Sequence, residues 1–413
     1  MKRILHIIAQ KPSDTGSGIF LQNIVRAADK KGYEQAIIAG ISAQDGDYSF
    51  NTKKEISFYP VVFESDELPY PVVGMSDVMP YVSTRYSDMN YNMLCQFMKV
   101  FEKAMENAAQ SFKPQIIISH HLWLVTALAV DIFRDCPIIA ICHGTDIRQL
   151  NGIFNYRDYI IEKIRKIPFI ISLSPYQKKE IQRIYGVSGD RIFVTGGGYN
   201  EDIFYPLRDK PPQDSIKIVY AGKLSFAKGV DSLIRALNYL PYEKEELTLV
   251  LVGDSNGKEK EEIMKLVDKC PYAVELKGRV SQKELGEVFR QCSIFIMPSF
   301  YEGLSLVTIE ALASGLLVVS NDLPGMREWI GESFNNRGIV RYVKMPRLKS
   351  IDRPYESQLP DYEIRLGQGI MEQIKKAKDD KGMSSIWADE IRERFSWDYV
   401  FSKVEDLFPK IYR

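Results

Sequence analysis

Short apolar runs alternate with amphipathic helical stretches in two series along the chain, and this pattern constrains the fold more than any other feature. Runs that are apolar on both faces are typical of buried parallel strands. The first series comprises Ile4–Ala9, Gln35–Ala39, Ile116–Ile118, Pro137–Cys142 and Phe169–Ser172. The second comprises Ile216–Tyr220, Leu247–Val252, Ala273–Leu276, Ser293–Met297 and Leu316–Ser320. We therefore expect two doubly wound α/β domains that face each other, with ligands beyond the carboxyl ends of their strands.

A polar stretch with three prolines, residues 204–215, separates the two series and is typical of a linker. It divides the chain into a predicted N-terminal domain over residues 1–205 and a second domain over residues 206–385. Within the second domain, prolines and charges in residues 343–383 predict a loop-rich insertion and a helix. Residues 386–413 form a third predicted segment, an amphipathic helical stretch whose apolar side must cover another surface.

Composition narrows the class of protein. Lys plus Arg and Asp plus Glu number 54 each in 413 residues, so no global field favours nucleic acid as a partner. The five cysteines show no C-x-x-C spacing for zinc or redox chemistry and predict reduced thiols. No apolar stretch approaches the length of a membrane span. We expect a cytoplasmic protein whose membrane contact, at the inner membrane face, is at most peripheral.

Three familiar ligand motifs are disfavoured, two by their spacing and one by its position in a turn. Gly16-Ser17-Gly18 opens a predicted helix but lacks the third glycine of the dinucleotide fingerprint, because residue 21 is leucine. The run from Gly253 to Lys258 has its glycines too close together for a phosphate loop, and glutamate follows the lysine. Asp45-Gly46-Asp47 has the carboxylate spacing of a metal clamp but predicts an exposed turn. No resident metal or cofactor is expected.

The strongest motif runs from Pro298 to Gly315. A predicted strand ends at a proline, a short loop carries Glu302, and a helix begins that carries Glu310. The amides and positive dipole end of such a helix N-terminus suit a diphosphate. Two carboxylates on either side of this turn can hold hydroxyl groups flanking the phosphates.

This run resembles the E-x7-E signature of the retaining glycosyltransferases of the GT-B fold, specifically family 4 (glycosyltransferase group 1). Residues 218–224, followed by Lys228-Gly229, resemble the strand and the two cations with which that family grips the donor diphosphate. Here Lys223 stands where arginine is usual, which keeps the charge but loses the bidentate fork. The resemblance implies two facing Rossmann-like domains and a C-terminal helix that crosses back to the first.

The resemblance also implies roles for individual residues. Lys228 contacts the phosphate, Glu302 the transferred sugar and Glu310 the ribose, while Gly278-Arg279-Val280 meets the nucleobase. His120 follows a buried strand and is the better candidate for the sugar near the reacting carbon, with His121 as the second. The implied catalytic residues are His120, Lys228 and Glu302. The implied donor-binding residues are Gly16, Gly18, His143, Lys223, Gly278, Arg279, Val280, Ser305, Leu306 and Glu310.

The expected activity is metal-independent transfer of a hexose from a nucleotide diphosphate sugar to an acceptor hydroxyl, with the anomeric configuration retained. We rank UDP-sugars first and GDP-mannose second as donors, and the acceptor is a saccharide, a lipid-linked saccharide or a small molecule. One alternative is a glycoside phosphorylase on the same fold, which the E-x7-E run disfavours because Glu310 would then lack a ribose. Another is a catalytically silent nucleotide-sugar or glycan binder, which the intact set of site residues disfavours.

Overall fold

The chain forms two compact units. The computed structural model describes residues 3–77, 79–150, 152, 155–207, 215–302, 304–379 and 384–411. Unit 1 consists of Met1–Gly197 and Trp397–Arg413, and unit 2 consists of Gly198–Ser396. The chain therefore enters unit 2 at Gly198, earlier than the predicted residue 206. It returns to unit 1 at Trp397, later than the predicted residue 386. Most of the predicted linker, residues 208–214, lies outside the described residues.

The two crossing points of the chain are held together within unit 2. The amide of Tyr199 donates a hydrogen bond to the carbonyl of Phe395 (3.0 Å), and Tyr199 forms an isolated parallel bridge with Ser396. Phe204 is buried in the core of unit 2, although it lies before the predicted boundary. Sequence periodicity could not place the boundary here because these contacts join residues that are almost 200 positions apart.

Unit 1 is built on a seven-stranded parallel sheet with the order β3-β2-β1-β6-β7-β8-β9. All five predicted strands of the first series are present. The strands are β1 (Arg3–Ile8), β2 (Glu34–Ser42), β3 (Ser57–Phe63), β6 (Ile116–His120), β7 (Ile138–Ile141), β8 (Phe169–Ser172) and β9 (Ile192–Val194). Strands β4 (Val73–Gly74) and β5 (Thr84–Arg85) form a separate small pair.

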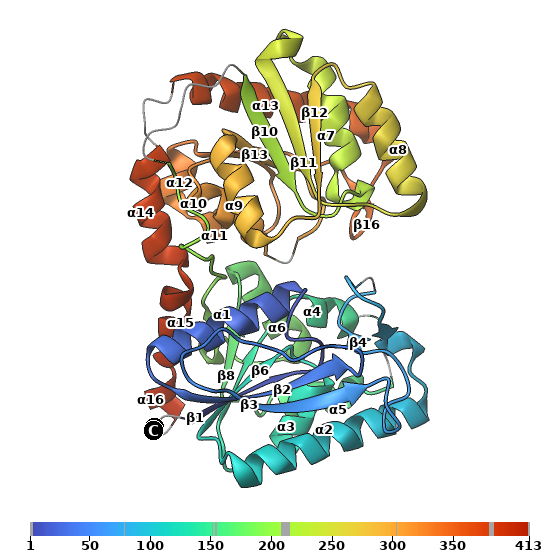
Figure 1. Cartoon of the computed structure of the whole chain (residues 1–413), viewed down its shortest axis with the longest axis vertical. Coiled ribbons are helices and arrows are strands. Elements are labelled where there is room, and N and C mark those ends of the chain that lie inside the picture. Colours follow the sequence, from blue (N-terminus) through green and yellow to red (C-terminus); the bar gives the residue numbers. More distant parts are fainter. Residues whose placement is uncertain are drawn as a thin grey trace. The chain divides into compact units, whose positions relative to one another are not determined.

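Helices cover this sheet (Figure 1). They are α1 (Gly16–Lys30), α2 (Tyr91–Ser111), α3 (Leu124–Ile132), α4 (Thr145–Leu150), α5 (Arg157–Ile164) and α6 (Pro175–Tyr185). Helix α1 begins at a capping threonine, Thr15, whose side chain accepts a hydrogen bond from the Gly18 amide. Its buried side includes Phe20, Leu21 and Ile24, so α1 packs through an apolar stripe.

Unit 2 contains a six-stranded parallel sheet with the order β12-β11-β10-β13-β14-β15. The strands are β10 (Ile216–Ala221), β11 (Leu247–Val252), β12 (Ala273–Gly278), β13 (Ile294–Met297), β14 (Leu317–Asn321) and β15 (Val340–Val343). The second series of predicted strands is thus present in full. Central strand β11 is buried at every position, as expected for a parallel strand covered on both faces.

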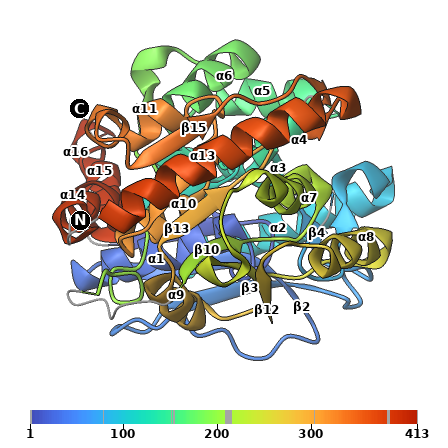
Figure 2. The ribbon, with the colours of Figure 1, turned by 90° about the horizontal axis from the view of Figure 1, so that it is seen from above.

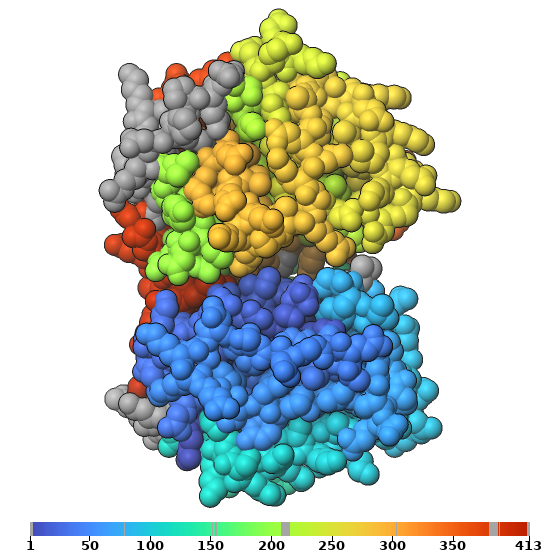
Figure 3. All heavy atoms as spheres, viewed as in Figure 1, coloured from blue at the N-terminus to red at the C-terminus, as the bar shows by residue number. Residues whose placement is uncertain are grey.

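The main helices of unit 2 are α7 (Val230–Ala236), α8 (Gly257–Asp268), α9 (Gln282–Gln291), α10 (Leu306–Ala313), α11 (Met326–Ile330), α12 (Glu332–Asn336), α13 (Leu359–Asp379) and α14 (Ser384–Phe395). The long helix α13, which Figure 2 shows along its length, packs against α7 and β14. Ile263 is the buried residue of α8, which lies on the surface of unit 2 (Figure 3). The predicted loop-rich insertion contains the short hairpin β16 (Leu348–Ser350) and β17 (Arg353–Pro354) before α13.

The predicted C-terminal helical stretch is divided between the units. Helix α14 belongs to unit 2, whereas α15 (Trp397–Glu405) and α16 (Phe408–Ile411) belong to unit 1. Trp397 packs edge-on against Phe20 of α1, with ring centroids 5.0 Å apart, and Lys30 forms an ion pair with Asp398 at 3.0 Å. The expected return of the chain to the first domain is therefore made by α15 and α16.

Two further findings concern the cysteines and the length and apolarity of the helices. The five cysteines are free thiols. Within the described parts of the chain, no helix combines the length and apolar character that a membrane crossing needs.

Candidate active site

In unit 2, the predicted donor-binding residues gather where neighbouring strands end. The amide of Gly222, just after β10, donates to Val252 of β11 (2.9 Å), and the Gly253 amide donates to Gly278 at the end of β12 (2.8 Å). These bonds hold Lys223 and Gly278-Arg279-Val280 at the same carboxyl edge of the sheet. Lys223 and Arg279 are exposed, so their charges face solvent at this edge.

Lys228 contacts Glu302 directly. The lysine ends the short helix η3 (Phe226–Lys228) after β10, and Glu302 lies in the loop after β13, the neighbouring strand. Lys228 Nζ donates to Glu302 Oε1 at 2.7 Å, with the two side chains 30% and 22% exposed. Gly303, the next residue of the E-x7-E run, lies outside the described residues. The side chain predicted to bind the phosphate therefore contacts the side chain predicted to bind the sugar, and both are partly exposed.

Backbone packing holds these two loops together. Gly229 follows Lys228 with a positive φ of 65°, and a Cβ atom there would lie 2.3 Å from the carbonyl oxygen of Pro298. Only glycine therefore fits this close approach. The amide of Phe300 donates to the carbonyl of Ala227 (3.2 Å), which ties the Glu302 loop to η3.

A buried polar clamp supports the Glu302 loop from below, and no sequence motif predicted it. Asn321, the last residue of β14, donates through Nδ2 to the carbonyls of Pro298 (2.8 Å) and Ser299 (3.1 Å). The Tyr362 hydroxyl of α13 donates to Asn321 Oδ1 (2.9 Å). Asn321 and Tyr362 are fully buried, so these bonds satisfy carbonyls that water does not reach. The only signal in the sequence was the position of Asn321 at a strand's carboxyl end.

Replacing Asn321 with alanine should destabilise unit 2 by roughly 2–4 kcal/mol, because two buried carbonyls lose the Asn321 amide and the Tyr362 hydroxyl keeps only its longer bond to the Pro298 carbonyl (3.4 Å). Tyr362→Phe removes one hydroxyl and should cost about 1 kcal/mol. Urea unfolding of the purified variants measures both values. Equal stability of Asn321→Ala and the wild type would contradict the clamp.

The third component of this edge is helix α10. Ser305 occupies the N-cap position and Leu306 begins the helix, while the hydroxyl of Thr308 donates to Ser305 Oγ (2.8 Å). Helix N-termini present amides without intrahelical acceptors, which suit a phosphate. Glu310 lies one turn further along, and burial raises the pKa of its carboxyl to about 7. A carboxyl group with such a pKa can donate or accept a hydrogen bond near neutral pH, which suits paired hydroxyl groups.

In unit 1, the loop between β1 and α1 is tightly built. A Cβ on Gly18 would lie 2.7 Å from the backbone nitrogen and oxygen of Ser13, so glycine is required there for packing within the loop. A Cβ on Gly16 would meet nothing within 4 Å. Gln10 donates to the hydroxyls of Thr15 and Ser17 (2.8 Å each), which orders the helix start. Of the two glycines, Gly16 alone leaves space for a ligand within this unit.

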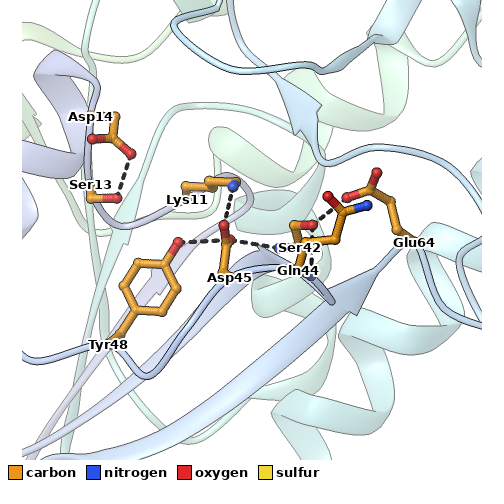
Figure 4. A network of polar contacts seen from close by, with 8 residues as sticks. All are labelled: Lys11, Ser13, Asp14, Ser42, Gln44, Asp45, Tyr48 and Glu64. Atoms are coloured by element: carbon orange, nitrogen blue, oxygen red, sulfur yellow. Dashed lines mark hydrogen bonds and ion pairs between the residues drawn. The ribbon is translucent and has the colours of Figure 1, made fainter.

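A polar network anchors the same loop (Figure 4). Lys11 Nζ pairs with Asp45 at 2.5 Å, and Asp45 also accepts from the Ser42 amide (2.8 Å) and the Tyr48 hydroxyl (2.9 Å). Burial opposes ionisation of Asp45, but these hydrogen bonds outweigh it and hold the pKa of Asp45 below its ordinary value. The predicted turn at Asp45 is present, yet the carboxylate is only 20% exposed and serves as an anchor for the β1–α1 loop.

The three predicted histidines cluster at the ends of neighbouring strands β6 and β7. His120 ends β6, and its Nδ1 lies 3.0 Å from Nε2 of His143, which follows β7. The His121 ring lies 4.7 Å from that of His143 between centroids, on a backbone with a positive φ of 72°. Burial lowers the pKa of His121 to about 4 and the pKa values of His120 and His143 well below 6.5. All three imidazoles are therefore neutral at neutral pH.

Asp146 organises this cluster, a role for which the sequence had no assignment. Its carboxylate is fully buried and accepts hydrogen bonds from the amides of Gly144 (2.7 Å), Leu122 (2.9 Å) and His143 (3.3 Å). It thereby holds the segment after β6 against the segment after β7. Asp146, the last residue of the run His143-Gly144-Thr145-Asp146, thus has a structural role within unit 1.

The predicted site residues thus form two groups, each at the carboxyl ends of parallel strands. Unit 2 brings Lys228 and Glu302 into contact, with Lys223, residues 278–280 and the start of α10 on the same edge. Unit 1 brings His120 and His143 into contact. The start of α1 follows β1, the strand that pairs with β6. Among the described residues, no group of three or more His, Cys, Asp or Glu side chains is placed to hold a metal ion.

Two units of this kind define a protein of the GT-B fold. The structure resembles sucrose-phosphate synthase from Thermosynechococcus elongatus with a TM-score of 0.72 and 16% identity, over 100% of this chain and 99% of that one. It resembles Anabaena HepE, solved in complex with UDP and glucose, with a TM-score of 0.69 and 16% identity, over 99% of this chain and 100% of that one. At these identities the likeness concerns the fold.

The sequence places the chain in a family within this fold. Residues 15–203 match the family described as Glycosyltransferase Family 4, and residues 207–344 match Glycosyl transferases group 1. The protein belongs to this glycosyltransferase family, as the E-x7-E run and the two cations predicted.

Curated relatives are similar over different parts of the chain. An uncharacterized glycosyltransferase of Methanocaldococcus jannaschii is 24% identical over 310 residues, which is 71% of this chain and 74% of the relative. D-inositol 3-phosphate glycosyltransferase of Xylanimonas cellulosilytica is 30% identical over 183 residues, which is 40% of this chain and 43% of the relative. Glycogen synthase of Mycobacterium tuberculosis is 25% identical, and the chain spans about half of it, 55%.

Proposed function

We propose that this glycosyltransferase moves a hexose from a nucleotide diphosphate sugar to an acceptor hydroxyl, with retention of the anomeric configuration and without a metal ion. The observation that carries the proposal is the contact between Lys228 and Glu302 beside the N-terminus of α10. A cation, a carboxylate and a helix N-terminus at one point offer binding groups for a diphosphate and for the hydroxyls beside it.

The chemistry required of these residues is electrostatic. As the bond between sugar and diphosphate breaks, negative charge grows on the departing diphosphate, and preorganised donors lower the barrier by binding that charge. Lys228, Lys223 and the amides at the start of α10 are the groups that would supply this stabilisation. The buried carboxyl of Glu310 would hold the ribose hydroxyls, and Glu302 would hold hydroxyls of the sugar.

UDP-glucose is the first donor to test. The crystal structure of Anabaena HepE in complex with UDP-glucose supports this choice, because that protein shares the fold over 99% of this chain. GDP-mannose is the second donor. The acceptor is proposed to be a saccharide, a lipid-linked saccharide or a small polyol, a range that includes the inositol phosphate named for the Xylanimonas relative.

A thermal-shift comparison of nucleotide sugars tests the donor. A ligand at 100 times its dissociation constant stabilises the native state by about 2.7 kcal/mol, which corresponds to a rise of roughly 5–10 °C in unfolding temperature. We expect such a rise with UDP-glucose and a smaller one with GDP-mannose. If no UDP- or GDP-sugar at millimolar concentration moves the unfolding temperature, the protein does not use these donors.

A further inference from the structure

The hydroxyl of Tyr220 supports the loop that carries Lys223, which we call the Lys223 loop (residues 222–224). Tyr220 lies in β10 and is only 2% exposed, yet its side chain reaches the loop that follows the strand. Its hydroxyl donates a hydrogen bond to the main-chain carbonyl oxygen of Lys223 at 2.8 Å. A buried side chain thus contacts the backbone of an exposed residue that is expected to bind the donor diphosphate.

The neighbouring strand fixes both ends of the Lys223 loop. The amide of Gly222 donates to the carbonyl of Val252 (2.9 Å), and the amide of Leu224 donates to the carbonyl of Asp254 (3.0 Å). Between these two bonds, the Tyr220 hydroxyl holds the carbonyl of Lys223. Hydrogen bonds at three consecutive residues therefore determine the path of the backbone from which the Lys223 side chain starts.

The Lys223 loop is shaped around the Tyr220 hydroxyl. Gly222 has a positive φ of 150°, and a Cβ atom at this position would lie 2.8 Å from the Tyr220 hydroxyl oxygen. The hydroxyl therefore occupies space that a side chain at position 222 would need, which explains the glycine. Burial raises the pKa of the Tyr220 hydroxyl well above its ordinary value, and the charge of Glu302 adds to the rise. The hydroxyl thus keeps its proton near neutral pH and remains a donor.

The position of the backbone matters more for a lysine than for an arginine at this place. Lysine carries a point charge on a flexible stem, and it lacks the planar fork with which arginine fixes its orientation on a phosphate. Lys223 is exposed, so its side chain gains little orientation from packing. The placement of its ammonium group therefore depends chiefly on the loop from which the side chain starts.

We propose that Tyr220 is a positioning residue whose hydroxyl holds the Lys223 loop so that the Lys223 ammonium group meets the diphosphate of the donor. Tyr220 would contribute to turnover through Lys223, without touching the donor itself. The identity of the ligand rests on the proposed function, whereas the support of the loop is a property of unit 2 alone. Tyr220→Phe is the variant that tests this role, because it removes the hydroxyl and keeps the buried ring.

Hydrogen–deuterium exchange of the free protein tests the support of the loop without any activity. Loss of one hydrogen bond should make the amides of Gly222 and Leu224 exchange about 5-fold faster in Tyr220→Phe. Tyr272→Phe is the matched control. Tyr272 is 4% exposed in the same unit and its hydroxyl donates to the Leu240 carbonyl, also at 2.8 Å, but it precedes β12 at the amino edge of the sheet. Unchanged exchange in Tyr220→Phe, or an equal rise in Tyr272→Phe, would overturn the proposal.

Release of UDP from UDP-glucose tests the consequence for the site. A displacement of about 1 Å can cost up to about 10²-fold in rate, so Tyr220→Phe should lower kcat/KM roughly 10-fold, while Tyr272→Phe stays within about twofold of the wild type. A loss of the same size in both variants would mean that the effect comes from lost stability of unit 2, which contradicts a positioning role.

A double-mutant cycle shows whether Tyr220 acts through Lys223. In a Lys223→Ala background, Tyr220→Phe should cost less than about twofold in kcat/KM, because the ammonium group that the hydroxyl positions is already absent. A full 10-fold loss in that background would contradict the proposal. A wild type that releases no UDP would contradict the proposed function instead, and the exchange measurement still decides whether Tyr220 supports the loop.

Discussion

Replacing Lys228 with alanine is expected to lower the release of UDP from UDP-glucose about 10²- to 10³-fold, measured as kcat under saturating donor. The loss of one donor that stabilises growing negative charge typically raises the barrier by about 3–4 kcal/mol. Lys228 carries a formal positive charge at the carboxyl edge of the unit 2 sheet and contacts Glu302 at 2.7 Å. The variant therefore removes the cation nearest to the predicted sugar ligand.

A matched control separates catalysis from folding. Lys217 forms an ion pair with Glu275 in the same unit, at the same 2.7 Å, with side chains 28% and 33% exposed, but it lies near the start of β10. Lys217→Ala should therefore retain turnover within about twofold, because loss of a partly exposed ion pair costs at most about 1 kcal/mol of stability. If Lys228→Ala keeps activity within threefold of the wild type, or if Lys217→Ala loses as much, Lys228 has no special role.

Acid destabilisation of unit 1 is the second large expected effect. Burial lowers the pKa of His6 and of His121 to about 4, whereas an unfolded histidine titrates near 6.5. Between these values the unfolded chain binds more protons than the folded one, so stability falls as the pH is lowered through this window. From pH 7 to pH 5 the two residues should cost on the order of 4 kcal/mol, and His120 and His143 add to the loss in the same direction.

His121→Asn isolates one of these contributions. The His121 backbone has a positive φ of 72°, a conformation that asparagine tolerates better than most residues, and asparagine does not titrate. Urea unfolding at pH 7 and pH 5 should therefore show a pH-dependent loss about 2 kcal/mol smaller in the variant than in the wild type. The comparison concerns the change between the two pH values, so a general effect of the substitution cancels. An identical pH dependence in both proteins would mean that His121 is not held neutral by burial.

Glu310 should make the stability of unit 2 depend on pH in the opposite direction. Burial raises the pKa of its carboxyl to about 7, above the ordinary value of 4.5. A raised pKa means that the folded state holds the proton more tightly, so stability declines as the pH rises from about 4.5 to about 7. The two units therefore respond to pH in opposite senses around pH 6.

The fold was largely predictable because parallel strands that are buried on both faces form continuous apolar runs. The strands that the sequence did not predict lie at or near sheet edges, where this signal is weak. Strand β3 contains Pro60, which normally argues against a strand but is tolerated at an edge. Strand β9 has only three residues and β15 has four, one of them Arg341.

The site was predictable in its residue types but not in its contacts. Lys228 and Glu302 are 74 positions apart, and only the pairing of β10 with β13 brings their loops together. Asn321 and Tyr362 carry no motif, because their function is to hold carbonyls of a loop that itself carries the motif. The sequence also could not predict the position at which the chain returns to unit 1. Phe395 and Trp397 belong to one apolar pattern but pack in different units.

The most direct test of the central claim follows the anomeric carbon itself. The protein is incubated with UDP-[1-¹³C]glucose and a panel of free sugars, sugar phosphates and inositol 3-phosphate, with EDTA present, and the product is read by ¹³C NMR. We predict release of UDP and an α-configured product at the labelled carbon, at a rate that chelation does not change. A β-configured product, a requirement for added divalent cation, or a label that never leaves the nucleotide would contradict the claim.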